Sequence, residues 1–400
     1  MRDSAIACCK SMQTVQLIIF GIPLLSLVWW WWADRRLRGA GRGVRMSFAL
    51  TVLVMLAGFV WVLLARRNVV ITPIPSIWYA VVLLWGLIFL PLVALPSMLG
   101  WSLWTLVRRI FKGRNASNET EETGTWSRRR WMTTFATTLP VLMTYGTTLF
   151  SVPRLARFRM REMTVSLADL PEVLDGMRIA HVTDTHVGKF TRGNVLDEIV
   201  AATNALDADL VLFTGDLIDN TIRDLPVAVD MMLRLRGKSG VFLIEGNHDL
   251  FDDPAGFERT VRESGIAMLR NESATVSVRG AIVQLLGIVW NHGEEEIAAD
   301  VDAVVKLRDP SAFPILLAHH PHAFDRAAEH GLPLTLAGHT HGGQMMLNRR
   351  LGAGPSMFRY WSGLYQKGDR VLVVGNGTGN WFPIRVNAPA EIIHLTLRKA

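Results

Sequence analysis

The chain has 400 residues, of which 50% are hydrophobic, and a formal charge of +7. This length exceeds one average domain, and the only two cysteines, the adjacent Cys8 and Cys9, exclude a disulfide framework and a thiolate metal site. That pair could be lipidated, although an inert pair is the favoured reading. The arginines cluster beside apolar runs, which fits anionic lipid headgroups as partners, so we expect membrane association and no nucleic-acid binding.

Residue usage divides the chain. Eleven of the fourteen tryptophans lie at or before Trp131, whereas all eleven histidines lie at His181 or later. Tryptophan and apolar runs are typical of a bilayer segment, and histidine is typical of a polar, metal-binding domain. We therefore expect a transmembrane region over residues 1–152, a linker over 153–176 and a globular domain over 177–400.

Four apolar runs in the first region predict about four membrane-spanning helices. A removable signal peptide competes for the first run, but arginines follow it instead of a small-residue cleavage site. The third contains Pro91 and Pro96, which neighbouring helices can tolerate in lipid. The fourth is the least apolar, and its threonines can bond back to the helix backbone. The runs extend from about Val15 to Ala33, Met46 to Ala65, Ile77 to about Leu99 and Trp131 to about Val152.

The basic residues predict an orientation. The loops after the first and third runs hold more arginine and lysine than the opposite side, so we expect a multi-pass protein of the cell (inner) membrane with an extracytoplasmic C-terminal domain. The segment from Ser127 to Met132 resembles a twin-arginine export signal, although a charged membrane flank is the favoured interpretation.

From Met177 onward, short apolar runs alternate with amphipathic stretches, which predicts an α/β fold. Thr275 to Val278 and Ile282 to Leu286, around Arg279 and Gly280, predict a hairpin. The other expected strands are Arg178 to Thr183, Leu210 to Thr214, Val241 to Glu245, Ile315 to Ala318 and Leu334 to Ala337. The expected helices are Asn194 to Leu206, Leu225 to Leu235, Ala255 to Ser264 and Ala323 to His330. Periodicity alone does not distinguish a sandwich from a doubly wound sheet.

Each of these five strands stops at a polar cluster, and their ends could converge at one edge of a sheet. The clusters are Asp184-Thr185-His186, Gly215-Asp216-Leu217-Ile218-Asp219, Gly246-Asn247-His248-Asp249, His319-His320-Pro321 and Gly338-His339-Thr340-His341-Gly342-Gly343-Gln344. A set of carboxylates, amide and imidazoles without thiols suits Mn, Fe, Zn or Mg. Two such cations would need a shared anionic ligand and would activate a water as hydroxide for phosphoryl hydrolysis. Taken alone, each motif is common as a turn or a helix cap.

In their order, these five motifs resemble the calcineurin-like metallophosphoesterase superfamily. The stretch Gly338 to Gln344, with Ile384-Arg385 and Pro389 to Ile392, is similar to the bacterial membrane-associated or exported branch. The resemblance covers roughly Met177 to Leu397. It implies a sandwich of two mixed β-sheets flanked by helices, with metals at the strand ends.

The resemblance also implies roles for single residues. Asp184, His186 and His341 would bind one divalent metal ion. Asn247, His319 and His339 would bind a second, and Asp216 would bridge the two. His248 would be catalytic, orienting the phosphoryl group and donating a proton to the leaving oxygen. Asp219 and Asp249 would orient imidazoles. Either His319 or His320 could be the ligand from the residues alone, and the family pattern selects His319.

The leading hypothesis is a membrane-anchored, two-metal phosphohydrolase that cleaves a phosphoester or pyrophosphate in a phosphorylated small molecule or a lipid. Four helices exceed what simple tethering needs, which motivates a lipid or lipid-linked substrate. A membrane sensor or assembly protein with a ligand-binding, non-catalytic phosphoesterase domain is the alternative. A transporter is weaker, because the helices lack buried charges.

Overall fold

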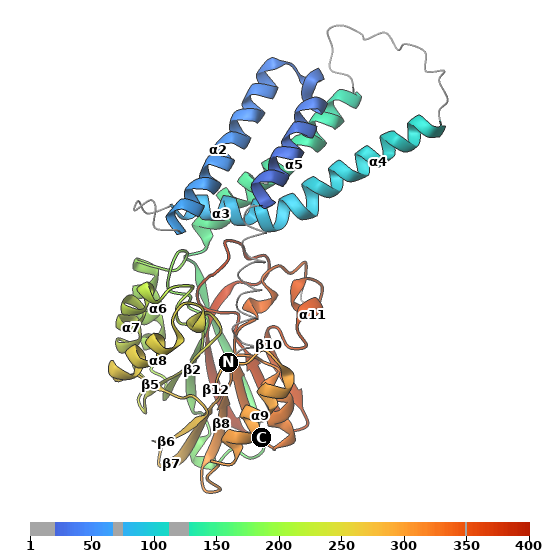
Figure 1. The fold of residues 1–400 in the computed structure, drawn as a ribbon. Helices are drawn as coiled ribbons and strands as arrows, with labels where there is room; N and C mark the ends of the chain where they lie inside the picture. Colours follow the sequence, from blue (N-terminus) through green and yellow to red (C-terminus); the bar gives the residue numbers. More distant parts are fainter. Residues whose placement is uncertain (1–20, 67–74, 112–127, 349) are drawn as a thin grey trace, which may run out of the picture. The chain divides into compact units, whose positions relative to one another are not determined.

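The computed structural model describes residues 21–66, 75–111, 128–348 and 350–400. The chain forms two compact units, Met1–Val152 and Pro153–Ala400. The N-terminal unit is helical and the C-terminal unit contains every strand of the described residues (Figure 1). Cys8 and Cys9 lie outside the described residues.

Helices occupy all four apolar segments of the N-terminal unit, as far as they are described. Residues 15–20 of the first segment lie outside the description, and residues 21–36 are helical. The helical elements that follow are η1 (Leu37–Ala40), α2 (Arg42–Arg66), α3 (Ser76–Leu84), η2 (Trp85–Ala94), α4 (Leu95–Phe111), α5 (Arg128–Ser151) and η3 (Val152–Arg154). The segment η2 is a π-helix that contains Pro91, which has no N–H for the usual helical bond.

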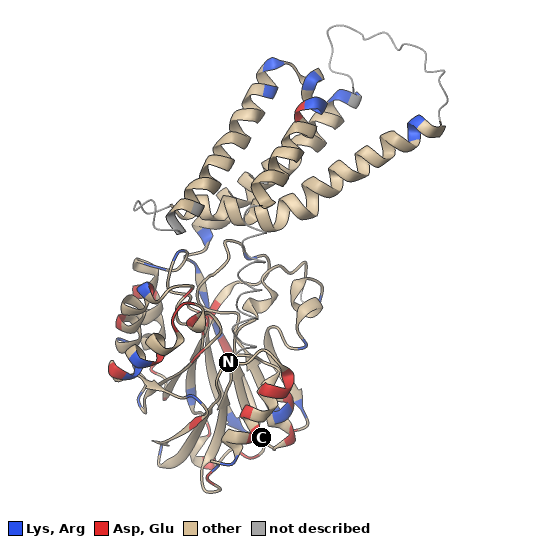
Figure 2. Ribbon diagram, viewed as in Figure 1, with Lys and Arg blue, Asp and Glu red and all other residues tan. Residues whose placement is uncertain are grey.

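Two of these helical segments are long and apolar enough to span a membrane. They are Arg42–Val62, with a mean hydropathy of 1.9, and Ser76–Phe111, with 2.3. In Figure 2 the ribbon colours of charged residues lie mainly near the ends of the described helices of this unit. Large apolar side chains such as Leu50, Leu103 and Phe135 are exposed along them. A membrane location is therefore plausible for this unit.

The fourth predicted span, α5, is a helix of 24 residues but is not among the two candidate spans. Its polarity comes mainly from threonines. Thr137, Thr144 and Thr148 each donate a hydrogen bond of 2.7–2.9 Å to the carbonyl four residues earlier. These bonds satisfy the hydroxyl groups within the helix itself.

The C-terminal unit contains two six-stranded mixed sheets. The first has the strand order β1-β12-β2-β3-β4-β5 and the second β10-β11-β9-β8-β7-β6. In the first, only β12 and β2 pair antiparallel; in the second, β6 with β7 and β10 with β11 do so. The predicted sandwich of two mixed sheets is confirmed.

The strands of the first sheet are β1 (Phe158–Leu167), β2 (Arg178–Val182), β3 (Leu210–Thr214), β4 (Val241–Ile244), β5 (Ala267–Met268) and β12 (Ala390–Lys399). Those of the second are β6 (Glu272–Val278), β7 (Ala281–Gly287), β8 (Phe313–Leu317), β9 (Leu334–Ala337), β10 (Gly363–Lys367) and β11 (Arg370–Val374). The expected hairpin is the antiparallel pair β6 and β7.

Helices cover the sheets. The helices are α6 (Asn194–Ala205), α7 (Leu225–Leu233), α8 (Pro254–Glu263), α9 (Glu294–Val305), α10 (Ala323–Glu329) and α11 (Ala353–Met357). Helix α8 begins where Asp253 accepts a hydrogen bond of 2.9 Å from the backbone N–H of Gly256, with Pro254 at the first helical position. Both residues therefore set the start of this helix.

The core has layers. One apolar cluster, with Leu212, Ile315 and Leu395, lies between the two sheets. A second cluster packs α6, α7 and α8 against the first sheet, and a third packs α9 and α10 against the second. The central parallel strands are buried on both faces, which explains their continuous runs of Val, Ile and Leu.

The segment that we expected to be a linker contains a strand. All ten residues of β1 pair in parallel with β12, from Phe158 opposite Ala390 to Leu167 opposite Lys399. Residues 153–176 therefore form part of the compact C-terminal unit. The exposed residues of this edge strand gave β1 no clear apolar pattern in the sequence.

Candidate metal centre

The predicted site residues converge where strands of both sheets end. Asp184 and His186 follow β2, and Asp216 follows β3. Asn247 and His248 follow β4, His319 follows β8, and His339 and His341 follow β9. The loops after parallel strands meet at one edge of an α/β sheet, which is where such folds place ligand sites.

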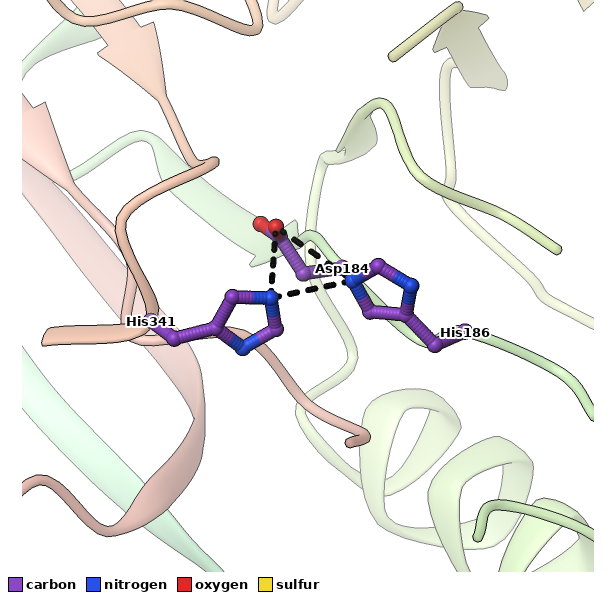
Figure 3. A group of neighbouring side chains, drawn as sticks. All are labelled: Asp184, His186 and His341. Atoms are coloured by element: carbon purple, nitrogen blue, oxygen red, sulfur yellow. Dashed lines mark hydrogen bonds and ion pairs between the residues drawn. The ribbon is translucent and has the colours of Figure 1, made fainter. Parts of the chain in front are cut away.

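Asp184, His186 and His341 form a first group of possible metal ligands (Figure 3). The Nε2 atoms of the two imidazoles lie 3.0 Å apart. Asp184 Oδ1 lies 3.3 Å from Nε2 of His341 and 3.8 Å from Nε2 of His186. All three side chains are buried, so one carboxylate and two imidazoles face one small space away from solvent.

Asp216, His319 and His339 form a second group. Oδ2 of Asp216 lies 3.2 Å from Nε2 of His319, and the same oxygen lies 3.4 Å from Nε2 of His186 in the first group. Nδ1 of His339 lies 2.9 Å from Oδ1 of Asn247. Asp216 thus stands between the two groups, and Asn247 joins the second.

The donor set fits divalent cations. Nε2 of His319 is buried and, within the described part of the chain, faces Oδ2 of Asp216 at 3.2 Å without completing a hydrogen bond. The Nε2 atoms of His186 and His341 are also close together, so three imidazole nitrogens point towards buried carboxylate oxygens. Buried polar atoms without partners are costly in protein alone. A pair of divalent cations would satisfy them, and the clusters are consistent with a binuclear site.

The backbone at these positions is unusual. Five of the site residues have positive φ angles, namely Asp184, His186, Asp216, His339 and His341, with values from 47° to 71°. Left-handed backbone in residues other than glycine costs energy and is concentrated at functional sites. Neighbouring glycines admit the close approach: a Cβ on Gly246 would lie 2.2 Å from Oδ1 of Asp216, and one on Gly338 would lie 2.2 Å from Oδ2 of Asp184.

Electrostatics couple the groups. Burial opposes protonation of His319, but the carboxylate of Asp216 outweighs it and raises the pKa of His319 to about 9. Burial and the charge of His319 lower the pKa of His339 to about 3. Burial likewise opposes the ionised form of Asp216, yet the neighbouring imidazoles hold the pKa of its carboxyl below the usual value. The site therefore favours an ionised Asp216 and a neutral His339.

His248 lies at the edge of the two groups. Its Nδ1 lies 2.5 Å from the backbone carbonyl oxygen of Asp219, and its backbone N–H donates 2.8 Å to Oδ1 of Asp216. The carbonyl accepts, so Nδ1 carries a proton. Burial works against protonation of the ring, but Asp219 and Asp216 raise the pKa of His248 overall. Phe251 and Trp381 contact the ring at centroid distances of 4.5 and 5.8 Å.

The structure brings His319, not His320, to Asp216. The ring of His320 packs against both Trp290 and His339, with centroid distances of 5.6 and 5.1 Å. Its Nδ1 accepts a hydrogen bond of 3.2 Å from the backbone N–H of His322. Burial and the neighbouring imidazoles lower the pKa of His320 to about 2.

The two expected orienting carboxylates act differently. Oδ1 of Asp219 lies 3.5 Å from Nδ1 of His248 and 3.7 Å from Nδ1 of His186, so it faces imidazoles. Asp249 instead accepts hydrogen bonds from the backbone N–H groups of Ile218 and Gly246, at 3.0 and 2.9 Å. Burial and the charge of Asp216 raise the pKa of Asp249 to about 7. Asp249 therefore positions the backbone at Ile218 and Gly246 and does not orient an imidazole.

Sequence reasoning gave no site role to two residues that contact the candidate ligands. Arg385 is partly buried and places Nη2 2.9 Å from Nδ1 of His341. Trp290 lies across the second group, with its ring 4.7 Å from that of His339 and 5.3 Å from that of His319. Arg385 belongs to a run that resembled one branch of the superfamily, and this was the available signal. Trp290 has no motif around it.

Comparison with known proteins agrees with this geometry. The calcineurin-like phosphoesterase family matches residues 177–343, which include every candidate ligand. Within the C-terminal unit, residues 177–343 are therefore similar to this family. The matched residues include the His/Asp clusters that could hold metal ions.

Several relatives share this unit. An uncharacterized metallophosphoesterase of Helicobacter pylori is 32% identical over 248 residues, which cover 61% of this chain and 65% of the relative. A transmembrane protein with metallophosphoesterase domain from Danio rerio is 28% identical over 275 residues, covering 65% of this chain and 61% of the relative. An uncharacterized metallophosphoesterase of Bacillus subtilis is 28% identical over 247 residues, covering 59% and 84%. The chain thus spans less than two thirds of the first two relatives.

Proposed function

We propose that this protein is a membrane-anchored phosphohydrolase that uses two divalent metal ions to cleave a phosphoester or pyrophosphate bond. The observation that carries the proposal is the position of Asp216. One of its oxygens, Oδ2, lies within 3.4 Å of an imidazole nitrogen from each ligand group. A shared carboxylate of this kind allows two cations to lie close together despite their repulsion.

The ligand assignment follows the two groups. Asp184, His186 and His341 hold one ion, and Asn247, His319 and His339 hold the other. Asp216 belongs to both. Mn, Fe, Zn and Mg all suit such a set of oxygen and nitrogen ligands. When bound, the ions supply an acidified water as nucleophile and neutralise the charge of the phosphoryl oxygens.

His248 acts on the substrate in this proposal. Because its Nδ1 is held by the carbonyl of Asp219, its Nε2 is available to the phosphoryl group and the leaving oxygen. The raised pKa of His248 favours the protonated ring that a general acid needs. A substrate can reach the ring of His248, since its side chain is 11% exposed whereas that of His186 is fully buried.

The membrane part of the proposal rests on the N-terminal unit. Two candidate spans and relatives described as transmembrane proteins support a membrane location, which we propose to be the cell (inner) membrane. We extend this to about four spans, with the phosphoesterase unit outside the cytoplasm, because of the distribution of arginine and lysine in the loops. A lipid or lipid-linked phosphate is the substrate class that best uses such an anchor.

A non-catalytic membrane sensor or assembly protein is the second candidate. It would keep the phosphoesterase fold and bind a ligand without turnover. The complete set of candidate ligands with His248 argues against it, because a domain that only binds needs neither a bridging carboxylate nor a general acid.

The test is hydrolysis of a chromogenic phosphomonoester and a chromogenic phosphodiester by the full-length protein in detergent with Mn²⁺. We expect turnover that chelator abolishes and that falls about 100-fold or more in His248→Ala, the range for loss of a general acid. The better ester identifies the substrate class. Bound metal without turnover of either ester, in wild type and variant alike, would favour the sensor.

A further inference from the structure

The chain enters the C-terminal unit beside the metal centre. The carbonyl oxygen of Leu155, close to the unit's first residue Pro153, accepts a hydrogen bond of 2.8 Å from Nδ2 of Asn380. Oδ1 of Asn380 accepts a bond of 2.6 Å from Nε of Arg385, which also contacts Nδ1 of His341. Only two side chains therefore separate the segment arriving from the helical unit and a proposed metal ligand.

Large apolar side chains are exposed around this centre. Phe251 and Trp381, whose rings contact His248, are 55% and 38% exposed. Met357 is 69% exposed and precedes Phe358, whose ring lies 5.6 Å from that of His339. Single exposed apolar residues need no explanation, but several around one site indicate an interaction surface.

A turn extends this apolar surface. Leu347 and Leu351 are 74% and 57% exposed, and the backbone N–H of Leu347 donates 2.8 Å to the carbonyl of Leu351. The preceding Met346 donates its N–H to the carbonyl of Val386, which is half-exposed and follows Arg385. We call the set of Phe251, Leu347, Leu351, Met357, Trp381 and Val386 the apolar rim.

Basic residues accompany the rim. Arg350 is exposed within the same turn, and Arg154 and Arg157 are exposed on the entering segment that Asn380 holds. Aliphatic side chains, a tryptophan and arginines together are typical of surfaces that lie in the interface of an anionic bilayer. The same chain carries two candidate membrane spans before residue 112, so a lipid bilayer is the partner that we infer for this surface.

We propose that the apolar rim inserts into the surface of a lipid bilayer and that the metal centre takes its phosphoester from there, as the headgroup of an amphiphilic lipid. The inference rests on the proposed phosphohydrolase function and adds the surface through which a lipid substrate would reach the site. Insertion of the rim would place His248 and the proposed ligands at headgroup depth. The lipid's apolar tail would remain in the bilayer while its phosphate reached the site.

Insertion is tested with the full-length protein in nanodiscs of equal parts phosphatidylcholine and phosphatidylglycerol. In a Cys8→Ser, Cys9→Ser background, a fluorophore is attached at Leu351→Cys or, as a matched control, at Ile282→Cys, which is 45% exposed on β7 next to the hairpin turn. Lipids carrying a nitroxide should quench the fluorophore at position 351 at least about twofold more than that at 282. Equal quenching, or a buried label at 351 that nitroxide lipids do not reach, overturns the proposal; the second result indicates a protein partner.

Substrate delivery is tested with Leu347→Ser, Leu351→Ser. We expect KM for phosphatidate in vesicles to rise about tenfold or more, as loss of buried apolar surface predicts, while hydrolysis of a soluble chromogenic ester stays at the wild-type rate. An unchanged KM for vesicles contradicts the inference. If wild-type protein hydrolyses neither substrate, the phosphohydrolase proposal fails, whereas the quenching result still decides whether the rim meets lipid.

Discussion

Nη2 of Arg385 lies 2.9 Å from Nδ1 of His341, whereas the other ring nitrogen of His341, Nε2, faces His186. The same guanidinium donates to Oδ1 of Asn380 and to the carbonyls of Asn376, Gly379 and Ala388. It therefore holds the ring of His341 in one orientation. Burial lowers the pKa of Arg385 to about 10, which leaves it charged at neutral pH.

Replacing this arginine should weaken metal binding. Arg385→Met removes the guanidinium that holds the ring of His341 in place, so the ring would have to be ordered when it binds an ion, and we expect Mn²⁺ affinity to fall about 10-fold. Isothermal titration with Mn²⁺ measures the change, beside Arg398→Met, which removes an exposed arginine paired with Asp175. Unchanged Mn²⁺ affinity in Arg385→Met would show that the contact does not position the ligand.

A single methyl group at residue 246 should disrupt the site. The Cβ of Gly246→Ala would lie 2.2 Å from Oδ1 and 2.5 Å from the backbone N of Asp216, and neither position can be vacated cheaply. We expect loss of at least one bound metal ion per chain. Gly280→Ala is the control, since it strains a positive φ of 88° but meets no atom within 4 Å. Equal metal content in both variants, measured by elemental analysis, would contradict this account.

Acid should destabilise the C-terminal unit partly through His181. This histidine is buried, with Nε2 2.8 Å from the hydroxyl of Thr214, and burial lowers its pKa to about 4. Between pH 6.5 and 4 the unfolded chain binds a proton that the folded chain excludes. The free energy of unfolding therefore decreases as the pH is lowered from 6.5 to 4, by about 3 kcal/mol in total.

The measurement is the pH dependence of unfolding by denaturant in the presence of chelator, which separates protonation from metal release. In His181→Gln, the slope of the unfolding free energy against pH should be smaller over this range, by up to the amount that corresponds to one bound proton. A variant with the same slope as wild type would place the acid sensitivity in other groups.

Chelation should lower the thermal stability of the protein. Ions that bind only the folded state stabilise it by about 2.7 kcal/mol at a concentration 100 times the dissociation constant, which is roughly 5–10 °C for a unit of this size. Differential scanning fluorimetry with and without chelator tests this, and Asp216→Ala should show a smaller shift. An identical melting temperature with and without chelator would mean that the folded protein holds no tightly bound metal.

Much of the C-terminal fold could be read from the sequence because its central strands are short, apolar and bounded by glycine and polar motifs. The strands ending at Thr214 and Ala337 lie where they were expected. Strand β1 was missed because its edge position leaves alternate residues exposed, and its partner β12 lies more than 200 residues away. Local pattern carries no information about such a pairing.

The residues of the candidate metal centre could also be predicted in part from the sequence. The motifs located the side chains that converge, since each lies directly after a strand. Arg385 could not be assigned a role, because a partly buried arginine and an exposed one look alike in sequence, and four of its five partners lie in the irregular loop 375–389 that holds it, where no periodic pattern places side chains. The number of membrane spans depends on α5, whose threonines make it less apolar than a clear span.

The most direct test of the central claim is to titrate Mn²⁺ into metal-free, full-length protein while measuring both bound metal and hydrolysis of the better chromogenic ester. The account predicts two ions per chain, turnover that rises with the second equivalent, and neither a second ion nor turnover in Asp216→Ala. Two bound ions with no turnover of either ester, or full turnover in Asp216→Ala, would contradict it.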